Sequence, residues 1–125
     1  MRLQETERQV INQSNRSADP DAAIPHARAE EVLEMIIDTL RTNSDRLHGH
    51  KVVLFGSRAR GSAKSRSDFD LGVVGEEPLP LEDFFALEDL LDELPTLYRI
   101  DWVDFARAGD AFRARALQAV EVIHE

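Results

Sequence analysis

The 125-residue sequence contains no cysteine, which excludes disulfide bonds and thiolate metal sites and agrees with a reducing compartment. No stretch approaches the roughly 18 apolar residues of a membrane-spanning helix, and residues 1–5 lack the apolar core of a signal peptide. Bases are scarce as well: 15 lysines and arginines stand against 24 acids, for a formal net charge of −9. Such a charge repels nucleic acids and anionic membranes. We therefore expect a cytoplasmic protein that binds neither nucleic acid nor membrane directly.

The composition changes at about residue 25. Residues 1–25 are mostly polar, and two prolines lie among asparagines, serines and aspartates in the second half of this segment, which is typical of an arm or linker. The alternative is a segment that docks on a partner or on a second copy of the chain. Residues 26–125 are expected to form one domain, since about 100 residues are enough to bury a core.

Residues 26–125 show the apolar patterns of alternating helices and strands. Apolar residues three and four positions apart indicate helices, and short apolar runs indicate strands. The helices are expected over residues 26–43, 57–61, 80–95 and 110–123. The strands are expected over residues 52–55, 68–74 and 97–105. This order predicts an α/β domain in which helices pack on a small sheet.

The turn after the first predicted strand has the composition of a phosphate site. Gly56 allows the backbone to approach a ligand closely, and the amides at the start of a helix opened by Ser57 suit a phosphate group. Basic residues that can neutralise a triphosphate follow this turn, and their spacing does not rank them. They are Arg58, Arg60, Lys64 and Arg66.

Paired carboxylates follow the basic residues. Asp68 and Asp70 share one face of a predicted strand, at a separation of about 6 to 7 Å. Carboxylates so close repel each other unless a cation lies between them, and Mg²⁺ combines carboxylate ligands with substrate phosphates. The face with Asp68 and Asp70 is expected to be open, and the opposite face, with Phe69, is expected to pack on helices.

A third acid is needed to complete a two-metal site or to deprotonate a hydroxyl nucleophile. The candidates are Asp101 and Asp104, which lie on opposite faces of the third predicted strand. If Asp101 faces the site, Ile100 and Trp102 face the helices, whereas choosing Asp104 would place both on the polar side. Burial of this large apolar pair favours Asp101.

The order of these elements resembles the DNA polymerase β-like nucleotidyltransferase superfamily. The motif is Gly56-Ser57, ten intervening residues, Asp68-Phe69-Asp70, and then Asp101 on an apolar strand. The short chain, the Gly-Ser-Arg-Ala-Arg-Gly run at residues 56–61 and the C-terminal residues 122–125 are most similar to the minimal nucleotidyltransferases, or MNT proteins. The resemblance covers residues 28–125. It implies a nucleotidyltransferase fold with a small mixed sheet and helices packed mainly on one face.

The resemblance implies Mg²⁺-dependent transfer of a nucleoside monophosphate, usually AMP from ATP, to a hydroxyl with release of pyrophosphate. By matching positions, Gly56 and Ser57 would hold the triphosphate, and Asp68 and Asp70 would bind two metal ions. Asp101 would complete the metal site and help to activate the acceptor. Many MNT proteins are antitoxins that adenylylate a tyrosine of a HEPN-domain ribonuclease toxin, so a toxin partner and a hetero- or homo-oligomer are expected.

Two alternatives remain open at this point. A non-catalytic antitoxin would neutralise the toxin by binding alone, and its acidic surface would mimic RNA against a basic ribonuclease. A nucleotidyltransferase for small molecules of the aminoglycoside type would need a substrate-binding domain that the sequence lacks. Because nothing after the catalytic core remains to build an acceptor pocket, we expect a second chain to complete the site.

Overall fold

The computed structural model describes residues 28–61, 63 and 67–125. The predicted arm at residues 1–25 lies outside the described residues, as do two of the predicted nucleotide-binding cations, Lys64 and Arg66. No helix in the described part of the chain is both long and apolar enough to cross a membrane.

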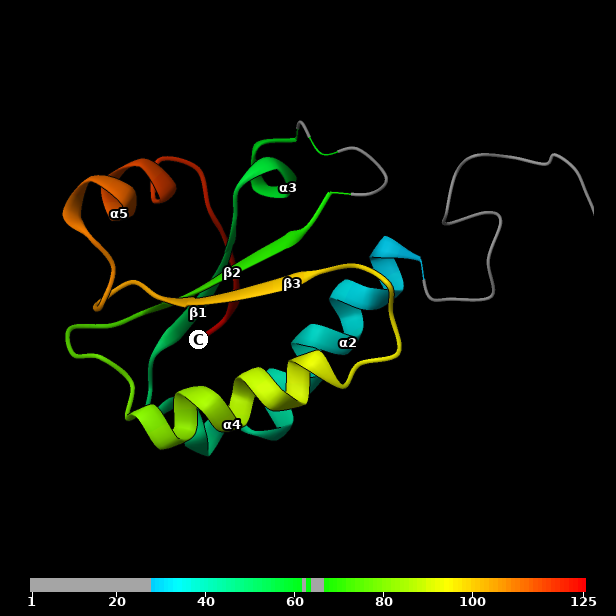
Figure 1. Ribbon diagram of the computed structural model, residues 1–125, viewed down its shortest axis with the longest axis horizontal. Helices are drawn as coiled ribbons and strands as arrows, with labels where there is room; N and C mark the ends of the chain where they lie inside the picture. Colours follow the sequence, from blue (N-terminus) through cyan, green and yellow to red (C-terminus); the bar gives the residue numbers. More distant parts are fainter. Residues whose placement is uncertain (1–27, 62, 64–66) are drawn as a thin grey trace, which may run out of the picture.

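Four strands form one sheet in the order β3-β2-β1-β4 (Figure 1). They are β1 (Lys51–Phe55), β2 (Phe69–Val74), β3 (Ile100–Asp104) and β4 (Glu121–His124). β1 runs antiparallel to both β2 and β4, whereas β2 and β3 are parallel. The mixed sheet that the family resemblance implies is confirmed.

Two longer helices cover one face of this sheet, and two shorter ones lie elsewhere (Figure 1). The longer ones are α2 (Ala29–Thr42) and α4 (Leu81–Asp92). The shorter ones are α3 (Ser57–Arg60), directly after β1, and α5 (Asp110–Ala116), on the opposite side of the sheet from α4. A 3₁₀ turn, η2 (Ser44–Leu47), joins α2 to β1. Helices packed mainly on one face, as the resemblance implies, are therefore observed.

The main core lies between the sheet and the helices α2 and α4. Residues four apart on α2 contribute one stripe, and alternate residues of β2 contribute another. Its largest fully buried side chains include Ile36, Leu40, Phe69, Leu71, Leu87 and Leu91. The predicted burial of Phe69 toward the helices is confirmed.

The opposite face of β2 is open only at its acidic end, which corrects the sequence-based expectation that the whole face is open. A second apolar cluster covers the other end and consists of Val53, Phe55 and Phe105. A Cβ atom on Gly72 would lie 2.6 Å from the Phe105 ring, so glycine is required for this ring to pack on β2. The cluster leaves Asp70 uncovered at the edge of an apolar surface.

The C-terminal residues also differ from the prediction. A helix through residue 123 was expected, but α5 ends at Ala116 and residues 121–124 form β4, which pairs with β1. Without β4, β1 would be an edge strand with unpaired backbone groups, and the β-branched Val122 and Ile123 favour an extended conformation. The third strand is shorter than expected as well, since it begins at Ile100.

Candidate active site

The turn between β1 and α3 lies in close contact with the carboxylate of Asp70. Gly56 has φ +77° and ψ −154°, a conformation that side chains other than glycine rarely adopt. A Cβ atom at this position would lie 2.2 Å from Oδ2 of Asp70. Gly56 thus brings the backbone at the start of α3 into direct contact with Asp70.

Asp70 on β2 and Asp101 on β3 lie opposite each other in the parallel pair. Burial raises the pKa of Asp70, and a side-chain hydrogen bond to Asp101 and the charges of Asp101 and Asp68 act in the same direction, so that the pKa is about 6. The charge of Arg60 acts in the opposite direction. The structure therefore brings Asp70 and Asp101 into contact and places Asp68 and Arg60 within electrostatic range of them.

Asp101 remains accessible although it carries an ion pair. Nε of Arg99 lies 3.1 Å from its Oδ1, and the two side chains are 76% and 36% exposed for Arg99 and Asp101 respectively. Exposed ion pairs of this kind contribute little stability and exchange readily with other partners. Asp101 is therefore available to a substrate or a cation.

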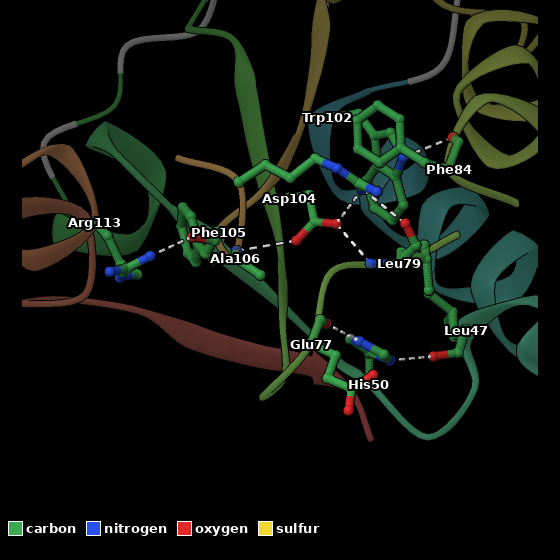
Figure 2. A network of polar contacts seen from close by, with 11 residues as sticks. Leu47, His50, Glu77, Leu79, Phe84, Trp102, Asp104, Phe105, Ala106 and Arg113 are labelled. Atoms are coloured by element: carbon green, nitrogen blue, oxygen red, sulfur yellow. Dashed lines mark hydrogen bonds and ion pairs between the residues drawn. The ribbon is translucent and has the colours of Figure 1, made fainter. Parts of the chain in front are cut away.

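Asp104 has a structural role in the fold, as Figure 2 shows. Its buried carboxylate accepts hydrogen bonds from the backbone N–H groups of Leu79 at 2.8 Å and Ala106 at 3.0 Å, and it pairs with Arg107 at 2.9 Å. Trp102 is buried beside the helices, where its indole N–H donates to the carbonyl of Phe84 at 3.0 Å. The selection of Asp101 over Asp104 by the burial of Trp102 thus agrees with the observed geometry.

The described cations of the predicted phosphate site differ in their surroundings. Arg60 is exposed, and its charge acts on Asp70. Arg58 is partly buried, and its guanidinium donates to the carbonyl of Ser67 from Nε at 3.1 Å and from Nη2 at 2.6 Å. Of these two, Arg60 is the one whose charge acts on the acid pair.

A hollow of about 450 Å³ lies beside the two acids and was not expected from the sequence. Asp70 and Asp101 line one part of it, and the apolar side chains of Phe55, Val103 and Phe112 line another. The sequence contains these apolar residues, but only the fold brings α5 next to the end of β1. An open hollow with one acidic and one apolar part therefore adjoins the two acids.

The acids suit a divalent cation through two carboxylates. Among the described residues, no three His, Asp or Glu side chains are grouped closely enough to hold a metal ion by themselves. Asp70 and Asp101 nevertheless supply hard oxygen donors, and the pKa of Asp70 is raised by its burial and, to a smaller extent, by the neighbouring Asp101 and Asp68. Mg²⁺ is commonly held by one or two carboxylates and by substrate phosphates, so this donor set fits it.

Residues 34–125 match the family described as Polymerase beta, Nucleotidyltransferase. The chain belongs to this family. A Haemophilus influenzae relative, named probable protein adenylyltransferase MntA, is 38% identical over 79 residues, which are 61% of this chain and 67% of the relative. This nucleotidyltransferase thus has the family and the similarity to MNT proteins that the motifs predicted.

Two solved structures share the fold of this nucleotidyltransferase. One is a toxin–antitoxin complex with AMP-PNP, with a TM-score of 0.54 and 24% identity over 73% of this chain and 71% of the other. The second is a tri-AMPylated Shewanella oneidensis HEPN toxin in complex with an MNT antitoxin, with a TM-score of 0.52 and 21% identity over 75% of this chain and 70% of the other. At these identities the likeness concerns the fold alone.

Proposed function

We propose that this nucleotidyltransferase moves AMP from ATP to a hydroxyl group of a HEPN-type toxin and thereby acts as an antitoxin. The proposed acceptor is the hydroxyl of a tyrosine. The observation that carries the proposal is the pairing of Asp70 with Asp101 beside the Gly56 turn. The name of the H. influenzae relative and the toxin–antitoxin complexes that share the fold support the same reaction.

The reaction forms one bond and breaks another at the α-phosphorus. The acceptor oxygen attacks this atom, the bond to the bridging oxygen of the β-phosphate breaks, and pyrophosphate leaves. Asp101 takes the proton of the acceptor hydroxyl, because it is accessible and lines the hollow through which an acceptor can approach.

Binding of the triphosphate falls to the turn after β1. The backbone at Gly56 and Ser57 would contact the phosphates, and Arg60 would offset part of their charge. Asp70 and Asp101, with the charge of Asp68 nearby, would hold Mg²⁺, which when bound would supply positive charge to the triphosphate and the leaving pyrophosphate. The raised pKa of Asp70 shows that its charged form is disfavoured without a cation, and a bound cation would stabilise that form.

Transfer of label from α-³²P-ATP to a HEPN toxin encoded beside this chain tests the proposal. We expect labelling with Mg²⁺, and a loss of about 10³-fold in rate for Asp70→Asn, because the carboxylate contributes several kcal/mol of charge stabilisation. Asp38→Asn on the exposed surface of α2 is the matched control and should label at the wild-type rate.

The outcomes separate the proposal from its alternatives. Mass spectrometry of the labelled toxin identifies the acceptor residue. If the wild-type chain and Asp70→Asn label the toxin equally, the catalytic assignment is wrong. If the chain neutralises the toxin without ATP, and Asp70→Asn does so as well, the antitoxin acts by binding rather than by chemistry.

A further inference from the structure

Arg58 joins segments that lie far apart in the sequence. Its Nε and Nη2 atoms both donate to the Ser67 carbonyl, at 3.1 and 2.6 Å. Its guanidinium carbon lies 4.2 Å from the centre of the Phe69 ring and 5.2 Å from that of Tyr98. These two rings meet edge to face at 5.5 Å. One side chain of α3 thus contacts the start of β2 and the residue two before β3.

Each segment that Arg58 contacts is adjacent to a group of the proposed site. Arg58 itself follows the Gly56 turn by two residues, and Ser67 and Phe69 flank Asp68. Tyr98 precedes Arg99, whose carbonyl accepts the backbone N–H of Phe69 at 2.9 Å, and Asp101 follows two residues later on β3. The contacts of Arg58 therefore bear on the relative positions of the turn and of all three acids.

The guanidinium lies on the side of the sheet away from the acids. Phe69 is 1% exposed and packs in the core with the helices, whereas Asp70, one residue later, faces the opposite side. Because Arg58 stacks on Phe69, its charge lies behind the strand that presents Asp70. A phosphate bound in front of Asp70 would lie across this strand from the guanidinium.

We propose that Arg58 is a positioning residue for nucleotidyl transfer, which fixes the Asp68 segment against the Gly56 turn, and not a phosphate ligand. The inference rests on the proposed function and assigns a role within that same site. Two charge-assisted bonds to one carbonyl and a cation–π contact hold the guanidinium in one orientation. Without it, Ser67 loses this anchor next to Asp68, while the acids themselves are unchanged.

The test compares Arg58→Ala with Arg58→Lys, and Arg41→Ala on the exposed surface of α2 is the matched control. We expect Arg58→Ala to lower kcat for labelling of the toxin by about 10- to 100-fold, since small misplacements of reacting groups cost rates of this order. Arg58→Lys should recover part of this loss, because lysine keeps the charge and one donor but lacks the planar fork. Arg41→Ala should match the wild type.

Two further measurements distinguish positioning from phosphate binding. The affinity for ATP in EDTA should change less than about 2-fold in Arg58→Ala and fall about 10-fold in Arg60→Ala, whose charge faces Asp70. Hydrogen–deuterium exchange at the amides of Ser67 to Asp70 should become faster in Arg58→Ala and stay unchanged in Arg41→Ala. Melting temperatures of all variants control for general loss of folding.

The proposal fails if Arg58→Ala weakens ATP binding as much as Arg60→Ala, or if its kcat equals that of the wild type. It also fails if exchange at Ser67 to Asp70 is unchanged. The wild-type chain could transfer no label while Arg58→Ala still shows faster exchange at these amides. This combination would refute the proposed function but not the anchoring by Arg58.

Discussion

The two aspartates of β3 lie three residues apart in opposite situations. Asp104, at the end of the strand, is 5% exposed and is matched by two backbone N–H groups and Arg107. Asp101 is accessible and faces the carboxylate of Asp70. Asp104 is thus surrounded by hydrogen-bond donors and a cation, whereas Asp101 lies next to a second acid.

This difference separates a structural charge from a functional one. A buried carboxylate with all its hydrogen bonds made has no capacity left for a ligand, and its partners depend on it. Two carboxylates in contact destabilise each other, so an arrangement that keeps them together is typical of a site where a ligand supplies the missing positive charge. The environment of each acid, and not its residue type, indicates its role.

Removal of the structural carboxylate should have the largest effect on stability. We expect Asp104→Ala to lower the free energy of unfolding by about 3 kcal/mol, because it leaves the buried N–H of Leu79 and the guanidinium of Arg107 without this partner. Asp101→Ala is the matched control on the same strand and should change stability by less than about 0.5 kcal/mol. Urea denaturation measures both, and equal losses would remove the distinction between the two acids.

The contact between Gly56 and Asp70 provides a smaller test on the functional side. Gly56→Ala should cost about 2 kcal/mol, since alanine strains the backbone at φ +77° and its methyl group would collide with the Asp70 carboxylate. Gly49 has a similar φ of +81°, and a Cβ atom there meets no described atom within 4 Å. Gly49→Ala should therefore cost only the backbone strain, about 1 kcal/mol.

Thermal denaturation and label transfer measure the two glycine variants. Gly56→Ala should also lose transfer activity, because Asp70 must move, whereas Gly49→Ala should keep it. If Gly56→Ala and Gly49→Ala lower the stability equally and both variants stay active, the close contact at Gly56 does not position the acid pair.

Periodicity and motif spacing placed the acids of the candidate site on their strands, because local strand geometry determines which face each acid takes. The continuous apolar run of residues 52–55 predicted a strand covered on both faces, and four of the five residues of β1 are buried. Alternation along β3 selected Asp101, because burying Trp102 leaves only that acid on the face of Asp70. Both conclusions need only local geometry and the burial of large apolar side chains.

Features that depend on long-range pairing were not predictable in this way. Residues 121–124 fit a helical stripe equally well, and only the unpaired edge of β1 makes them a strand. The spacing of the cations could not separate Arg58 from Arg60, since that distinction comes from Phe69 and Tyr98 on other segments. The hollow beside Asp101 likewise requires α5 to fold back onto Phe55.

The smallest effect that we expect is a pH dependence of stability that arises from the raised pKa of Asp70. The pKa of Asp70 is raised from 3.8 to about 6 in the folded chain. Between these values the folded state holds a proton that the unfolded state has released, so this contribution to stability is present below about pH 4 and is lost as the pH rises through about 6. Because Asp70 is partly exposed, solvent screening reduces the effect to about 1 kcal/mol.

Asp70→Asn removes this titration and therefore measures it. Relative to the wild type, the variant should gain about 1 kcal/mol more stability at about pH 7.5 than at about pH 4 in urea denaturation. Asp38 is exposed and pairs with Arg41 rather than with another acid. Asp38→Asn should therefore show no such difference from the wild type between the two pH values. A constant difference for Asp70→Asn across this range would mean that neither burial nor the neighbouring acids raise the pKa of Asp70 in solution, and the contrast between Asp101 and Asp104 would lose this support.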